Sequence, residues 1–248
     1  LPESGLYIEP GSALDFRRIF DRRPAGSLGG VIVNRAGKLA FEKEPEKEVR
    51  FFSVQGFPDM MTKPELKEYA AAVARQGFNM IRLHFLDAYL NFQKKEAPWL
   101  KKGVNKPVDL PQDASEIRFS PIALDRIFYL IACLKAEGVY VNLDLQCSFY
   151  GYRNGTAPSG YPKDAENAKI QMFISEKFRK NYAVGTKKLL NTVNPYTGLA
   201  LKDEPAVAML CFYNEQDILL DHRNYGKEFH PAYVRFLKDK YGTPEAMN

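Results

Sequence analysis

The chain has 248 residues, which suffices for one large α/β domain or two smaller ones, and its 45% hydrophobic content is enough for a sizeable core. Its 35 lysines and arginines and 30 aspartates and glutamates are interspersed, as in Glu42-Lys43-Glu44. The net charge of +5 therefore forms no basic stripe, and we expect no nucleic-acid partner. No run of about 18 apolar residues occurs, so we expect no membrane-spanning helix and no membrane partner.

The cysteines and histidines show neither a disulfide pattern nor metal-ligand spacing. The cysteines are odd in number and lie far apart, each within an apolar stretch: Cys133, Cys147 and Cys211. Such cysteines are typical of buried thiols. No spacing such as HExxH links the histidines, which are His84, His222 and His230. We therefore expect no metal and no cofactor.

The first 48 residues have no clear hydrophobic period and are punctuated by glycines. Two short apolar runs, residues 31–33 and 38–41, flank an Asn-Arg-Ala-Gly segment, which predicts a β-hairpin. We interpret residues 1–48 as an N-terminal segment that packs against a main domain formed by residues 49–248.

From residue 49 onward, helical and strand patterns alternate. Thr62-Lys63-Pro64-Glu65 begins the first helix, and Gly77 ends it. The predicted strands are residues 50–54, 79–85, 139–145 and 206–213, and the other predicted helices are residues 120–137, about 167–191 and 231–241. This alternation predicts a parallel sheet with helical crossovers.

The strands are apolar on both faces and end in polar residues, as in sheets covered by helices. A doubly wound fold would have a glycine-rich turn after its first strand, and Val54-Gln55-Gly56-Phe57-Pro58 is not such a turn. We therefore predict a (β/α)8 TIM barrel. A closed barrel needs about eight βα units. This chain supplies roughly the first four, so we expect the amino-terminal half of a barrel.

Two segments resemble a known enzyme group. Residues 203–217 combine a polar turn, a buried strand and Asn214-Glu215 at the end of the strand. Residues 77–84 contain the pattern G-x-N-x-(I/V)-R, which runs from Gly77 to Arg82. They resemble the fourth and second strands of clan A glycoside hydrolases, the group that contains the family 5 cellulases and mannanases. Residues 11–248 are similar to the amino-terminal half of cellulase-like bacterial members. The chain differs from family 5 after the third strand, where Gln146-Cys147 replaces a histidine.

The resemblance implies a retaining O-glycoside hydrolase that acts on β-linked poly- or oligosaccharides. It implies that Glu215 is the general acid/base, that Asn214 hydrogen-bonds the 2-hydroxyl of the sugar, and that Arg82 supports the nucleophile. Retention requires two carboxyl groups about 5–5.5 Å apart. The nucleophile is expected from a seventh strand beyond Asn248. The resemblance also implies an extracellular or periplasmic protein, although the chain starts at Leu1 without a signal peptide.

Further candidates for sugar binding lie on loops or near strand ends: His84, Asp87, Trp99, Asp144 and Tyr152. Aromatic rings can stack on sugars. Each candidate has a structural alternative. The aromatic rings suit core packing, the His84 and Asp87 side chains suit loop anchoring, and the Asp144 side chain faces either the site or a helix. Glu215 also suits a structural role as a helix cap or as part of a surface salt bridge. Arg82 also suits a structural role in an ion pair inside the barrel.

Two other functions remain open at this point. A non-catalytic carbohydrate-binding or interaction domain on the same scaffold would keep the aromatic and polar rim but lack a second carboxylate. A barrel enzyme of other chemistry would need a strand-end lysine or a phosphate-binding glycine loop, and neither is evident. A half barrel has two open sheet edges. We therefore expect these 248 residues alone to be inactive and to self-associate.

Overall fold

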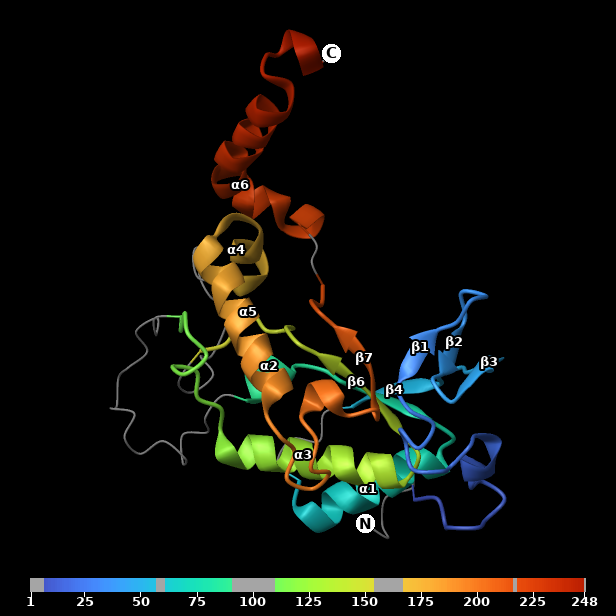
Figure 1. Cartoon of the computed structure of the whole chain (residues 1–248). Helices are drawn as coiled ribbons and strands as arrows, with labels where there is room; N and C mark the ends of the chain where they lie inside the picture. Colours follow the sequence, from blue (N-terminus) through green and yellow to red (C-terminus); the bar gives the residue numbers. More distant parts are fainter. Residues whose placement is uncertain (1–6, 57–60, 91–109, 154–166, 216–217, 248) are drawn as a thin grey trace.

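The computed structural model describes residues 7–56, 61–90, 110–153, 167–215 and 218–247, which form two separate sheets (Figure 1). The first sheet is antiparallel and has three strands, β1 (Val31–Val33), β2 (Leu39–Phe41) and β3 (Glu44–Glu48). The second is parallel and has four strands, β4 (Ser53–Gly56), β5 (Met80–Leu83), β6 (Tyr140–Asp144) and β7 (Val207–Cys211).

The parallel strands are hydrogen-bonded in the order in which they follow one another in the chain, β4-β5-β6-β7. A doubly wound sheet would reverse its strand order at a switch point, whereas a (β/α) barrel keeps the order. Helices lie between the strands: α1 (Lys63–Arg75), α2 (Leu86–Tyr89), α3 (Pro121–Ala136), α4 (Ala168–Ile174) and α5 (Glu176–Asn191). The fold is therefore part of a (β/α) barrel, as the sequence predicted.

Local sequence accounts for the start and end of the first crossover helix. Thr62 and Glu65 form a capping box at the start of α1, and Pro64 lies in its first turn. Gly77 follows the helix with φ of 84°, in the left-handed region that favours glycine. Figure 1 shows α1 and α3 side by side against the parallel sheet, and their buried residues form the main core with β5 and β6. The packing of α1 and α3 holds β5 and β6 in place, and with them the residues at the carboxyl ends of these two strands.

The N-terminal segment packs against the amino ends of the parallel strands. The Arg22 guanidinium donates to the backbone oxygens of Phe78 and Ala74, and Ala25 N donates to Lys135 O at 2.8 Å. Tyr140 OH accepts from Gly26 N at 3.2 Å. These bonds tie residues 22–26 to the opposite end of the sheet from the predicted catalytic residues. The domain boundary at residue 48 itself stays a prediction.

The structure corrects four element predictions. The strand β3 was missed because Glu44–Glu48 has no apolar alternation, yet it pairs with β2. The helix predicted over residues 167–191 is broken at Ser175 into α4 and α5. The strand predicted over residues 50–54 is shifted to β4. The last helix, α6 (Ile218–Tyr241), begins well before Pro231, which lies inside it, although an internal proline removes a backbone donor and crowds the carbonyl oxygen four residues earlier.

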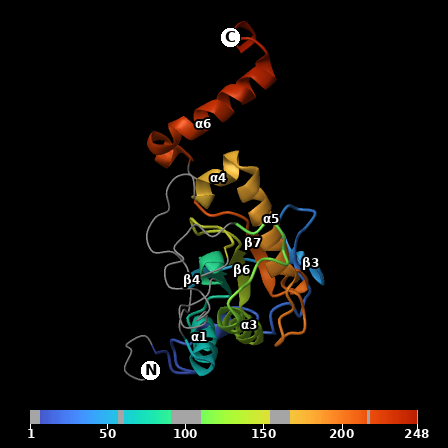
Figure 2. The ribbon, with the colours of Figure 1, turned by 90° about the vertical axis from the view of Figure 1, so that its left-hand side faces the viewer.

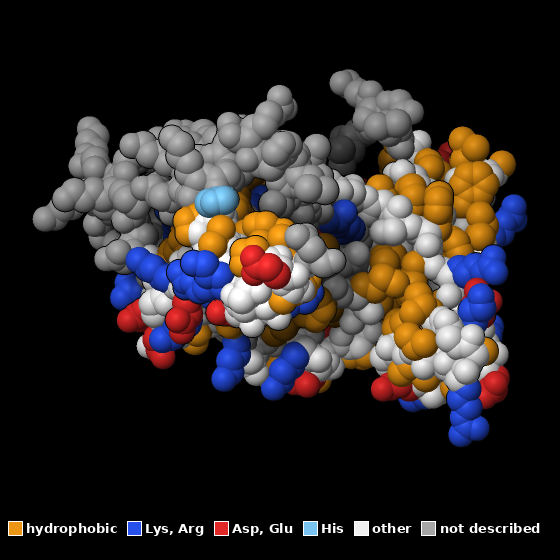
Figure 3. All heavy atoms as spheres, turned by 90° about the horizontal axis from the view of Figure 1, so that it is seen from above, with side chains coloured by type: hydrophobic (Ala, Val, Ile, Leu, Met, Phe, Trp, Pro, Cys, Tyr) orange, Lys and Arg blue, Asp and Glu red, His pale blue; other side chains and the backbone are white. Residues whose placement is uncertain are grey.

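The helix α6 projects away from the rest of the molecule in both ribbon views (Figures 1 and 2). It meets α4 where the rings of Phe173 and Phe229 lie 6.3 Å apart. Tyr233 and Phe236 on α6 are exposed. Seen from above, basic and acidic side chains are interspersed on the described surface, and hydrophobic side chains lie together over the right-hand part of the view (Figure 3). Within the described ranges, no helix has both the length and the apolar character that crossing a bilayer requires.

Candidate active site

The candidate site lies where β5, β6 and β7 end. The parallel register pairs Arg82 with Asn142, and Asp144 with Cys211, so the ends of the three strands are level with one another. Carboxyl ends of parallel strands are where barrel enzymes carry their chemistry. Asn214 and Glu215 follow β7 at the same edge.

An ion pair between Arg82 and Asp144 forms the centre of the site. Arg82 Nε donates to both carboxylate oxygens at 2.9 Å, and Arg82 Nη2 lies 2.7 Å from Asp144 Oδ2. The same Nη2 donates to Asn214 Oδ1 at 2.6 Å. One guanidinium thus links the ends of β5, β6 and β7. Because Asp144 is fully buried, this planar two-point contact fixes the orientation of Arg82.

The Asp144 carboxyl stays ionised in this setting. Burial by itself would raise its pKa, but the bonds from Arg82, His84 and Cys147 outweigh burial and hold that pKa below its usual range. The carboxylate in turn raises the pKa of the Arg82 guanidinium. Both partners therefore carry full charge, and Asp144 acts on the site by holding Arg82.

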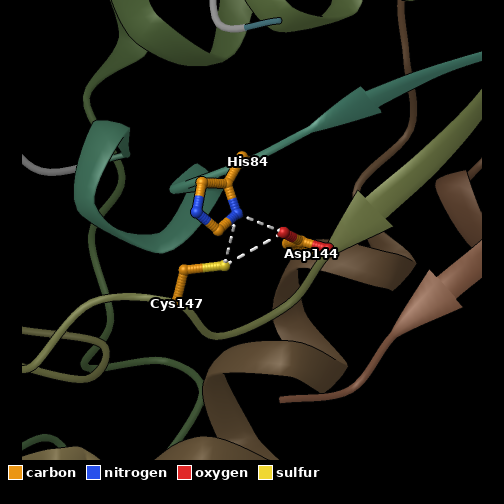
Figure 4. A group of neighbouring side chains, drawn as sticks. All are labelled: His84, Asp144 and Cys147. Carbon is orange, nitrogen blue, oxygen red and sulfur yellow. Dashed lines mark hydrogen bonds and ion pairs between the residues drawn. The ribbon is translucent and has the colours of Figure 1, made fainter. Parts of the chain in front are cut away.

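His84, Asp144 and Cys147 form a compact cluster beside this ion pair (Figure 4). His84 Nδ1 lies 2.5 Å from Asp144 Oδ2, and the Cys147 thiol donates to the same oxygen at 3.1 Å. Cys147 Sγ is 3.3 Å from His84 Nδ1. Nitrogen, oxygen and sulfur donors of this kind can bind zinc. The three side chains are therefore the residues that could hold a metal ion in the part of the chain that the structure describes.

The contact with Arg82 favours a hydrogen-bond network over a metal centre at this cluster. Arg82 already donates to both Asp144 oxygens, so a metal ion would compete with a guanidinium for the same carboxylate. Burial raises the pKa of the Cys147 thiol far above its usual range, so in this arrangement the thiol is protonated and donates to Asp144. The cluster thus supports the Arg82–Asp144 pair.

Asp87 anchors the loop that follows β6. Its side chain is buried and accepts from Ser148 Oγ at 2.6 Å and from the backbone nitrogens of Ser148 and Cys147 at 3.0 and 3.1 Å. Burial raises its pKa, and these donors oppose that rise only in part. Of the two roles that the sequence left open, the contacts favour loop anchoring.

Glu215 is exposed and has a buried partner. Its side chain is 72% exposed, and its Oε2 accepts from Lys169 Nζ of α4 at 3.1 Å. The backbone φ of Glu215 is 52°, an unusual value for a residue other than glycine. The Lys169 ammonium lowers the pKa of the Glu215 carboxyl. In this arrangement Glu215 is a carboxylate, whereas a general acid must hold a proton.

The structure brings together four of the predicted side chains, Arg82, His84, Asp144 and Asn214, and places Glu215 next to them along the chain. Tyr152 is not on the site surface. It is 2% exposed, its hydroxyl donates to Leu145 O, and its ring fills the space above Gly185, so it is a core residue. Trp99 lies outside the described residues.

Sequence reasoning missed two residues of this region, Lys169 and Cys147. Cys147 was expected to be buried and was noted as a departure from family 5, but it was not named as a site residue, and nothing in its spacing indicated contact with His84 and Asp144. One feature of the sequence could have indicated Lys169, because it lies between the apolar residues Ala168 and Ile170 at the start of a helix. A lysine in such a place is rarely buried unless its charge is paired, which predicts an acidic partner.

Solved structures with a similar fold include glycoside hydrolases. An endo-1,4-beta-mannanase from Rhizomucor miehei superposes with a TM-score of 0.50 at 13% identity, over 75% of this chain and 48% of the mannanase. An endo-beta-1,4-mannanase from Thermotoga petrophila gives a TM-score of 0.44 at 19% identity, over 68% of this chain and 35% of that one. A family 5 glycoside hydrolase from Bacteroides vulgatus gives a TM-score of 0.37 at 14% identity, over 77% of this chain and 40% of the hydrolase.

The chain spans about half the length of the Rhizomucor miehei mannanase, with 48% of that enzyme covered. That likeness supports a glycosidase-like barrel fold and, at 13% identity, nothing finer. No protein-family model matches the sequence, and no curated protein matches it.

Proposed function

We propose that this chain carries the acid/base half of a retaining O-glycoside hydrolase that acts on β-linked poly- or oligosaccharides. One observation supports this most strongly: Arg82 binds Asn214 Oδ1 at 2.6 Å while its other contacts hold it to Asp144. Asn214 is thereby held in place immediately before Glu215 at a strand end. The fold shared with a mannanase is consistent with this reading.

In the proposed reaction, Glu215 protonates the leaving glycosidic oxygen while a second carboxylate attacks the anomeric carbon. Glu215 then takes a proton from the water that releases the sugar. Asn214 binds the 2-hydroxyl, a contact that strengthens in the transition state. Two other carboxylates near this edge among the described residues, Asp87 and Asp144, are buried and already paired. We therefore propose that neither of these two is the nucleophile.

The test uses the natural polypeptide that contains this chain. Its hydrolysis of soluble β-1,4-mannan and β-1,4-glucan oligosaccharides is measured for the wild type, Glu215→Gln and Glu176→Gln. The control residue Glu176 is an exposed acid in the first turn of α5. We expect Glu215→Gln to lose about 100-fold or more in kcat, a typical loss for a general acid or base, with no change for Glu176→Gln. Equal activity of all three proteins would refute the proposal.

A non-catalytic carbohydrate-binding domain is the second candidate. It is favoured by the ion pair between Glu215 and Lys169, because a carboxylate held by an ammonium is suited to binding sugar hydroxyls without proton transfer. This candidate predicts that oligosaccharides bind without turnover and that Glu215→Gln changes affinity only. Hydrolysis that depends on Glu215 would exclude it.

A further inference from the structure

We infer that Lys169 is a positioning residue of the candidate site, whose ammonium holds the carboxylate of Glu215 at the end of β7. The inference rests on the proposed function for its catalytic meaning, but the contact can be tested without it. Lys169 belongs to α4, on a different segment from the strands that carry Arg82 and Asp144.

The position of Lys169 is fixed by several contacts. Asn167 caps α4 by accepting from Lys169 N at 3.0 Å. Lys169 is 8% exposed, and its Nζ lies 4.7 Å from the centroid of the Phe149 ring as well as 3.1 Å from Glu215 Oε2. A second bond, from Tyr213 OH to Ala168 O at 3.2 Å, ties the end of β7 to the start of α4.

Burial of Lys169 distinguishes this ion pair from one between two exposed side chains. A buried ammonium loses hydration and needs a counter-charge or hydrogen-bond acceptors. The contacts described for the Lys169 ammonium are the Phe149 ring face and the Glu215 carboxylate. The pair therefore restrains Glu215, whose backbone is in the left-handed region and whose side chain is otherwise open to solvent.

The charges that face Glu215 come from two elements. Lys169 on α4 has the largest influence and lowers the pKa of Glu215, and His84 at the end of β5 acts in the same direction. The neighbouring Asn214 amide adds a smaller contribution of the same sign. All three favour the carboxylate, so Glu215 gives up its proton at a lower pH than an isolated glutamate.

This arrangement has a consequence for the two stages of the proposed reaction. The carboxylate form is the one needed when Glu215 acts as a base in the second stage. The first stage needs the protonated form of Glu215. Because the Lys169 ammonium stabilises the Glu215 carboxylate, this form is lost at a lower pH than in an isolated glutamate. The alkaline limb of the pH–rate profile should therefore lie at acidic pH. Replacing Lys169 by a neutral residue raises the pKa of Glu215 and moves that limb to higher pH.

The experiment is a titration of the Glu215 carboxyl by 13C NMR in the natural polypeptide that contains this chain, with the signal assigned by its absence in Glu215→Gln. We compare the wild type with Lys169→Met, Lys169→Arg and the control Lys187→Met, which removes an exposed lysine from α5. We expect a higher midpoint in Lys169→Met and the wild-type midpoint in Lys169→Arg and Lys187→Met. An unchanged midpoint in Lys169→Met would overturn the inference.

A second neutral variant, Lys169→Gln, covers the case in which Lys169→Met does not fold, because its side chain is polar as well as uncharged. The Glu215 midpoint should rise in Lys169→Gln too, since the ammonium that lowers it is gone. An unchanged midpoint in Lys169→Gln would also overturn the inference. The titrations require no catalysis. If the midpoint shifts but the natural polypeptide is inactive, only the proposed function fails; if hydrolysis depends on Glu215 and the midpoint does not shift, only the role of Lys169 fails.

Discussion

Replacing Asp144 by asparagine tests whether the Arg82–Asp144 pair holds the site together. Asp144 is fully buried, and the side chain of Arg82 is 28% exposed. Removing one partner of a buried ion pair costs about 3–5 kcal/mol, because the remaining charge is left without compensation. Arg82 can regain part of its hydration through its exposed portion, so we expect the lower end, about 3 kcal/mol. The amide also places an N–H group among the donors of Arg82, His84 and Cys147.

The assay is equilibrium unfolding in urea followed by far-UV circular dichroism, with Asp125→Asn as the matched control. Asp125 pairs with Lys63 at 3.1 Å, but both side chains are more than 40% exposed, so the control should lose far less free energy of unfolding. Equal losses in the two variants would refute the reasoning, because burial would then not decide the strength of the pair.

The same comparison has a defined pH dependence. The pKa of Asp144 is lower in the folded protein than the ordinary value of 3.8. Its stabilising contribution is therefore complete above about pH 4 and is lost as the pH falls through the folded-state pKa. We expect the stability difference between the wild type and Asp144→Asn to shrink on acidification in that range. A difference that grows as the pH falls would contradict the charge assignment.

Three further predictions concern other parts of the molecule. Gly138→Ala should cost about 2 kcal/mol or more in free energy of unfolding, because φ is 71° and a Cβ would lie 2.9 Å from Arg22 Cα; Gly198→Ala, with φ of 74° but open space, should cost only about 1 kcal/mol. Equal costs would show that the contact with the N-terminal segment is unimportant. Because burial raises the pKa of Asp87 above 3.8, its ionisation destabilises the fold as the pH rises from that value through the folded-state pKa, so Asp87→Asn should gain stability relative to the wild type over that interval in a pH series of urea titrations. If the difference in free energy of unfolding between Asp87→Asn and the wild type did not change with pH, the burial argument would be contradicted. Finally, β4 and β7 are the outer strands of the described parallel sheet, and β7 is only half buried along its length, so sedimentation velocity of the 248-residue chain should show concentration-dependent self-association; a monomer at all concentrations would contradict this.

Much of the architecture could be predicted because it is encoded locally. The capping box at Thr62, the glycine after α1 and the alternation of apolar strands with amphipathic helices are readable within short windows, and they led to the barrel class. The placement of Asn214 and Glu215 at the end of a buried strand could likewise be predicted from the neighbouring residues alone. The strand β3 was not predicted because its residues are mostly charged and show no hydrophobic period, although its backbone pairs with β2.

The candidate site depended on contacts between distant residues. Arg82 and Asp144 are 62 positions apart, and Arg82 and Asn214 are 132 apart. Hydrophobic periodicity indicates which residues belong to a strand, but the register between strands decides which polar side chains meet. Sequence reasoning therefore named Arg82 and Asp144 without pairing them.

The sequence by itself determined that this chain forms parallel βα units and places polar side chains where the strands end. Only the tertiary structure decided what each of those side chains does. It buried Tyr152 in the core, assigned Asp87 to a loop and placed the Lys169 ammonium against Glu215. The physical reason is that a charged group acquires its role from the charges, donors and solvent within a few ångströms of it, and folding brings these together from separate segments of the chain.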